Sequence, residues 1–155
     1  MHHLKFGSII TLVLFAMLLM ACEGSAQTQE EALTQRAEAF AKVMGKGDWL
    51  GAHKFFSPRY REICASGQFA ISTGLSMNFL KGFLGIAEGE QLTFSVTSVT
   101  VDGDEGRVFS DIHRNGELID FGGEDEGGRW VYVAGEWWSE DEDWEDGCDP
   151  NKIFE

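Results

Sequence analysis

The feature that most constrains the fold is a change of hydrophobic period after residue 86. Up to that point apolar side chains recur every three or four residues, which is the pattern of amphipathic helices. From residue 92 they alternate with polar residues in runs rich in β-branched side chains, as in half-buried strands. Helices followed by strands predict an α+β fold, with the N-terminal helices packed on one face of a curved antiparallel β-meander.

Local signals place the ends of the expected helices. Thr28 and Glu31 fit a capping box, Asp48 fits an N-cap, and Ser57 followed by Pro58 fits a cap with a first-turn proline. The expected helical segments are 28–45, 49–56, 58–66 and 75–86. The expected strands are 92–101, 107–113, 117–121 and a long last strand, 129–138, joined by Gly- and Asp-containing turns.

The chain opens with a segment typical of secretion signals. A short basic start, "MHHLK", precedes an apolar run from Phe6 to Ala21, whose 16 residues are fewer than the roughly 20 of a bilayer span. The run ends in "LMAC", which resembles the bacterial lipobox, and that resemblance implies acylation of Cys22. We therefore expect a lipoprotein with a lipid attached at Cys22, although an ordinary cleaved signal and an uncleaved anchor are the alternatives.

These signals divide the chain into four parts. They are a signal peptide (1–21), a tether (22–29), one α+β domain (30–138) and an acidic C-terminal tail (139–155). Removing 21 of 155 residues leaves 134, enough for a single domain with its own core. The expected location is a bacterial membrane, with the domain lipid-anchored on the extracytoplasmic side, either periplasmic or at the cell surface.

Charge narrows the range of partners. The whole chain carries a net charge of −14, and loss of Lys5 with the signal leaves 11 basic against 26 acidic residues, or −15. Such a charge repels nucleic-acid phosphates and anionic lipid headgroups. We expect no nucleic-acid partner, and we expect the domain to stand off the membrane on its tether.

Two cysteines remain once Cys22 is acylated. An even number of thiols in an oxidising compartment predicts a disulfide between Cys64 and Cys148. The alternatives are two buried thiols, or Cys148 loose in the tail. No CxxC motif or nearby histidine pair accompanies either cysteine, so neither a metal site nor a cofactor is expected.

Residues 28–138 resemble the nuclear-transport-factor-2-like superfamily, including its SnoaL-like and ketosteroid-isomerase-like branches. The stretches that carry the resemblance are "TQEEALTQRAEAFAKVMGKGD", "DWLGAHKFFSP", "EICASGQFA" and "GGRWVYVAGEW". The resemblance implies a cone-shaped fold around an apolar pocket. Relatives include isomerases, dehydratases, hydrolases and cyclases, and many non-catalytic binding domains.

Candidate pocket residues follow from the expected elements and the cone. They are Trp49, His53, Phe56, Tyr60, Phe109, Trp130 and Tyr132. Asp111 and His113 are the candidates for acid–base chemistry, because they share one strand face with Phe109. The alternative turns that face outward and leave Val108, Ser110 and Ile112 inside.

The sequence favours a non-catalytic domain that binds a small apolar ligand or a partner protein. It contains no nucleophile–base pairing, P-loop or dinucleotide fingerprint. The alternative is an isomerase, dehydratase or cyclase that uses Asp111 and His113. A third interpretation is an accessory subunit that forms a homodimer through its open sheet face.

Overall fold

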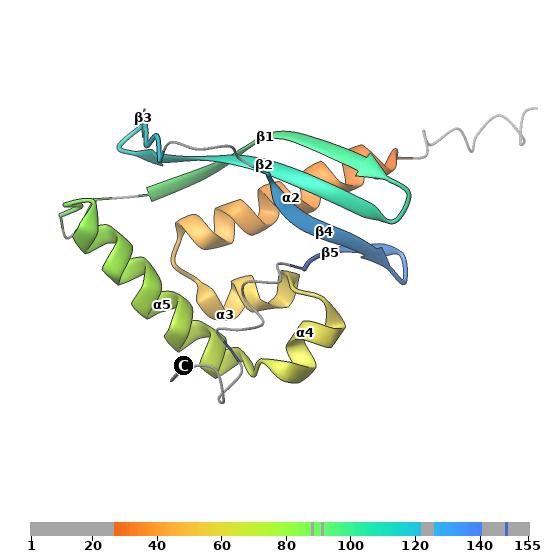
Figure 1. Cartoon of the computed structure of the whole chain (residues 1–155), viewed down its shortest axis with the longest axis horizontal. Coiled ribbons are helices and arrows are strands. Elements are labelled where there is room, and N and C mark those ends of the chain that lie inside the picture. Colours follow the sequence, from red (N-terminus) through yellow and green to blue (C-terminus); the bar gives the residue numbers. More distant parts are fainter. Residues whose placement is uncertain (1–26, 88, 91, 122–125, 141–147, 149–155) are drawn as a thin grey trace, which may run out of the picture.

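The computed structural model describes residues 27–87, 89–90, 92–121, 126–140 and 148 (Figure 1). The helices are α2 (Gln29–Gly45), α3 (Trp49–Ala52), the 3₁₀ helix η2 (His53–Phe55), α4 (Pro58–Ile63) and α5 (Ser66–Phe83). The strands are β1 (Leu92–Asp102), β2 (Glu105–Arg114), β3 (Glu117–Leu118), β4 (Gly128–Val133) and β5 (Glu136–Ser139). The expected α+β class, with helices preceding an antiparallel sheet, is confirmed. The signal segment, Cys22 and most of the acidic tail lie outside the described residues.

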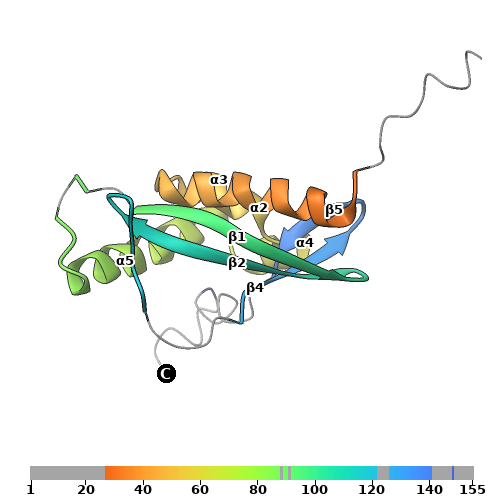
Figure 2. The ribbon, with the colours of Figure 1, turned by 90° about the horizontal axis from the view of Figure 1, so that it is seen from above.

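The strands form one curled antiparallel sheet in the order β1-β2-β4-β5. β3 pairs with the end of β2, and β4 pairs with its beginning, where Gly106 lies opposite Trp130. α2 lies along β1 and β2, and α3 and α4 follow beyond it (Figures 1 and 2). Among the helices of the described part of the chain, none is long and apolar enough to cross a membrane.

Three of the expected helix starts are confirmed by their hydrogen bonds. Glu31 donates its backbone N–H to the Thr28 hydroxyl at 3.1 Å, and the Glu31 carboxylate accepts from the Thr28 N–H at 3.1 Å. Asp48 accepts from the N–H three residues further on at 2.9 Å. The Ser57 hydroxyl accepts from the Tyr60 N–H at 3.1 Å, ahead of the first turn of α4. Each cap satisfies a backbone donor that the first helical turn leaves unpaired.

The expected long strand 129–138 is wrong, because the chain turns back within it. Ala134 and Gly135 have φ values of 54° and 88°, and they join β4 to β5 as an antiparallel hairpin. Two left-handed residues between paired strands are the geometry of a tight two-residue turn. Alanine rarely adopts this conformation, so "VAGE" gave little sign of the turn.

Two other elements differ from the sequence-based expectation. The expected strand 117–121 is reduced to the two residues of β3. The last helix begins at Ser66, earlier than the expected residue 75, although Gly67 and Gly74 weaken helical propensity there. Gly74 is accommodated because it lies directly against the Trp49 indole.

The interior consists of two apolar clusters. One joins α2 to the sheet and comprises Leu33, Ala37, Val108, Trp130 and Trp137. The other lies among the helices and comprises Met44, Ala52, Phe56, Tyr60, Cys64, Phe69 and Cys148. Gly106 permits the close approach of α2 to β2, because a Cβ atom there would lie 2.5 Å from the Leu33 side chain.

The expected Cys64–Cys148 pairing is confirmed. The two Cα atoms lie 5.2 Å apart, across 84 residues of sequence, and both cysteines are buried. Gln68 donates to the Cys148 carbonyl at 3.0 Å, and the Tyr60 hydroxyl lies 3.4 Å from the Cys148 sulfur. The disulfide therefore fastens residue 148 to the junction of α4 and α5.

Candidate functional site

An apolar cavity of about 350 Å³ lies between α2 and the inner face of the sheet. We call it the inner pocket. Its lining consists of Ala37, Phe40, Ala41, Met44, Phe56, Phe94, Val108, Ser110, Ile112, Gly128, Trp130 and Ser139. The volume falls in the range of small-molecule sites.

Regular spacing on two elements builds most of this wall. Ala37, Ala41 and Met44 recur at helical spacing on one side of α2. Alternate residues of β2 complete the opposite wall, because strand side chains point to the two faces in turn. The small side chains at Ala37 and Ala41, and the absence of one at Gly128, leave the space that larger residues would fill.

The chemistry of the lining is that of a binding pocket. Its polar side chains are two serines, Ser110 and Ser139, and no side chain of the lining titrates. An apolar wall with a few hydroxyls recognises an uncharged apolar molecule and orients one polar group on it. Acid–base catalysis requires a proton donor or acceptor within hydrogen-bond reach of the substrate.

The predicted pocket residues divide among several places. Phe56 and Trp130 line the inner pocket. His53 and Tyr60 are buried in the helical cluster, where the His53 Nε2 atom lies 2.7 Å from the Cys64 carbonyl oxygen. Trp49 packs against the same cluster and is half-buried. Of these three residues, Tyr60 supports the pocket wall, since its ring centroid lies 4.6 Å from that of Phe56.

Phe109, Asp111 and His113 lie on the face of β2 opposite to the inner pocket. Their neighbours Val108, Ser110 and Ile112 line that pocket, so alternation along the strand turns the three away from it. The Phe109 ring lies against Gly127, and His113 Nδ1 lies 3.5 Å from the Ser95 hydroxyl. The structure thus agrees with the alternative interpretation, in which this face of the strand points outward.

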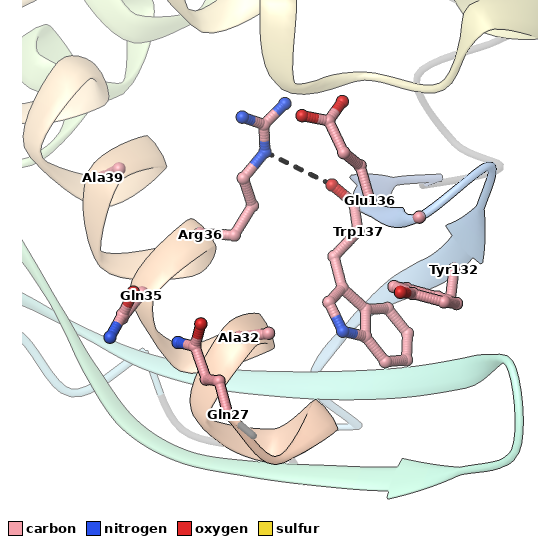
Figure 3. A pocket seen from close by; sticks show the side chains of 9 residues that line it. Gln27, Ala32, Gln35, Arg36, Ala39, Tyr132, Glu136 and Trp137 are labelled. Atoms are coloured by element: carbon pink, nitrogen blue, oxygen red, sulfur yellow. Dashed lines mark hydrogen bonds between the residues drawn. The ribbon is translucent and has the colours of Figure 1, made fainter. Parts of the chain in front are cut away.

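Tyr132 lines a second, shallower site, which we call the Arg36 groove (Figure 3). The groove measures about 470 Å³ and is lined by Gln27, Ala32, Gln35, Arg36, Ala39, Tyr132, Gly135, Glu136 and Trp137. The positively charged group in this groove, the Arg36 guanidinium, already has protein partners. Arg36 donates through Nε to the Trp137 carbonyl at 3.3 Å, and its guanidinium lies 4.6 Å from the Phe55 ring centroid and 5.0 Å from that of Trp138.

The Arg36 groove is a weaker candidate than the inner pocket. It mixes exposed amides and a carboxylate with the edge of an aromatic cluster. The Trp137 indole N–H is buried and has no hydrogen-bond partner within the described part of the chain. We therefore place the candidate site in the inner pocket, whose lining is apolar apart from two serines.

Electrostatics and metal chemistry do not point to another site. The Arg114 guanidinium, 2.7 Å from Glu90, lowers the pKa of that carboxyl below its usual value, and the Ala87 N–H adds to the effect. This pair joins the entry of β1 to the end of β2 and lies outside the inner pocket. Among the described residues, no group of three or more His, Cys, Asp or Glu side chains is placed to hold a metal ion.

Sequence reasoning did not name Phe40, Met44 or Phe94 as pocket residues, and it placed Ser110 inside only in the alternative orientation of its strand. A signal was present for the first two, because they belong to the apolar stripe of the first helix. Which part of that stripe faces a cavity and which part is packed depends on the sheet opposite.

No protein-family model, curated protein or solved structure matches this chain.

Proposed function

We propose that this protein is a lipid-anchored, extracytoplasmic domain that binds a small apolar ligand in the inner pocket. The observation that carries the proposal is the pocket itself, a cavity of about 350 Å³ with a wall of apolar side chains and two serines. Such a wall favours an uncharged ligand, because burying a charge there without a partner would be costly.

The proposed location is supported by the cysteines. Cys22 ends a lipobox-like sequence, and the Cys64–Cys148 disulfide is of the kind that persists in oxidising compartments. We also propose that the domain is a divergent nuclear-transport-factor-2-like domain. The support is the order of elements, helices followed by a curled antiparallel sheet, with an apolar cavity between them.

Binding is favoured over acid–base catalysis by the positions of the titratable candidates. Asp111 and His113 belong to the opposite face of β2, while Ser110 between them lines the pocket. A substrate held in the inner pocket would be separated from both side chains by the sheet backbone. We therefore expect Asp111→Ala and His113→Ala to leave ligand binding unchanged.

Filling the inner pocket should weaken ligand binding strongly. Ser110→Trp places an indole into the cavity from β2, and Asp111→Trp places the same indole on the opposite face of the same strand. The uncharged fluorescent probe N-phenyl-1-naphthylamine serves as the ligand, titrated into the chain lacking residues 1–22. We expect binding to weaken at least about tenfold in Ser110→Trp, and Asp111→Trp to bind as the wild type does.

The adjacent pair of substitutions makes the result decisive. Both variants carry the same added apolar surface on one strand, so loss of probe binding in Ser110→Trp alone locates the probe in the cavity. Equal binding by the two variants, or no binding by the wild type, would contradict the proposed ligand site. Circular dichroism of both variants checks that the sheet has formed.

Substitution of Cys22 should abolish attachment of the lipid. Cys22→Ser removes the thiol that would carry diacylglycerol, so radiolabelled palmitate should no longer be incorporated. One acyl chain binds a membrane only marginally, and stable anchoring requires more than one. Palmitate labelling that persists in Cys22→Ser, or an absence of labelling in the wild type in a bacterial host, would rule out the lipid anchor at Cys22.

A further inference from the structure

α5 carries a row of large apolar side chains that are open to solvent. Ile71, Leu75, Phe79 and Phe83 are 67%, 66%, 79% and 81% exposed. They are four residues apart, so they follow one another along the helix surface as a continuous ridge. We call these four residues the α5 ridge. Single exposed apolar residues are normal, whereas a contiguous row of this size marks an interaction site.

The ridge lies on the side of α5 that faces away from the core. The helix is held through Phe69 and Thr73, both buried, and through Gly74 against the Trp49 indole. Successive helical residues are about 100° apart, so the ridge is centred about 120° around the helix from Phe69 and Thr73. Packing among the described residues therefore does not cover the ridge.

The charge of this segment differs from that of the rest of the chain. Residues 63–87 contain no Asp or Glu, and their single charged side chain is Lys81. The whole chain carries 26 acidic residues and a net charge of −14. Two copies would repel each other if they met through most of the surface, but much less if they met through this acid-free helix.

We propose that the α5 ridge is a homodimer interface, in which the ridge of one copy packs against the same ridge of a second copy. A two-fold axis makes such a contact self-complementary. A ridge of residues four apart fits between the equivalent rows of its partner when the helices cross at about −50°. This interface differs from a dimer through the open sheet face, and it does not depend on the ligand pocket.

The apolar area is sufficient for a dimer of modest affinity. A phenylalanine buries about 150–250 Å², so the four ridge residues present roughly 500 Å² per copy. A stable interface buries about 600–1,000 Å² per partner. The serine, asparagine and glycine residues beside the ridge supply the remainder without an acidic side chain.

The position of α5 favours a second copy over a lipid surface. The start of α2, from which the N-terminal segment leaves, lies at the opposite end of the molecule from α5 (Figures 1 and 2). An anchor attached before α2 would hold that end near the membrane. The α5 ridge would then remain accessible to another copy anchored in the same membrane.

Phe79→Glu tests the interface against a matched substitution elsewhere. Phe79 is the third residue of the ridge, and Phe121 is 54% exposed and lies beyond β3, outside α5. The full chain is purified in a mild detergent, and its mass is measured by light scattering at about 10–100 µM. We expect a dimer for the wild type and for Phe121→Glu, and a monomer for Phe79→Glu.

Each result bears on the proposal. All three proteins share the N-terminal apolar segment, so association through that segment would be the same in each and would contradict the proposed interface. A wild type that is monomeric throughout the concentration range would also overturn it. Phe79→Glu lies on an exposed surface, and an unchanged circular dichroism spectrum verifies that loss of the dimer is not loss of the fold.

Discussion

Reduction of the Cys64–Cys148 disulfide is expected to lower the free energy of unfolding by about 4 kcal/mol. The bond joins residues 84 apart in sequence, so in the oxidised protein it restricts the unfolded chain over more than half its length. Without it, the unfolded state gains the conformational entropy of that loop. Urea unfolding with and without dithiothreitol measures the difference.

A double variant separates the cross-link from the packing of the two sulfurs. Cys64→Ala/Cys148→Ala should unfold at lower urea than the oxidised wild type and should show no response to dithiothreitol. Both cysteines are buried, so the double variant also loses some packing. Identical unfolding midpoints for the oxidised and reduced wild type would contradict a stabilising disulfide.

Phe56→Ala is expected to cost about 3–5 kcal/mol of unfolding free energy. Phe56 is 1% exposed, and its ring centroid lies 4.6 Å from that of Tyr60, 5.0 Å from Phe69 and 5.8 Å from Phe40. Truncation removes contacts with all three rings and enlarges the inner pocket. Its backbone also bridges to Ser139, so the loss reaches the junction between helices and sheet.

A phenylalanine on the surface provides the comparison for this effect. Phe121→Ala should change the unfolding free energy by less than about 1 kcal/mol, because its side chain is already half exposed. Urea unfolding of both variants gives the two values under the same conditions. A similar loss in Phe56→Ala and Phe121→Ala would mean that Phe56 does not hold the helices to the sheet.

Features that depend on neighbouring residues were predictable from sequence. The caps at Thr28, Asp48 and Ser57 are confirmed because each side chain accepts from the backbone N–H three residues further on. The change from helix to strand is confirmed for the same reason, since hydrophobic period is a local property. The pairing of Cys64 with Cys148 followed from the number of cysteines that remained.

Features that depend on residues far apart in the sequence were not predictable from it. The turn at Ala134–Gly135 divided an expected strand, because pairing of Trp130 with Ser139 and of Tyr132 with Trp137 outweighs the strain of a left-handed alanine. The direction of Asp111 and His113 was open in the sequence, since alternation defines two faces without telling which is inside. α2 decides it by packing against Val108.

The amino-acid sequence alone determined the class of fold, the helix starts capped by Thr28, Asp48 and Ser57, and the two cysteines available for a disulfide, because short-range hydrogen bonding and hydrophobic period suffice for them. Only the tertiary structure decided that Ala37, Ala41 and Gly128 leave a cavity and that the α5 ridge is uncovered. Both depend on which surfaces meet across the chain, and residual space is what remains after the larger side chains have packed.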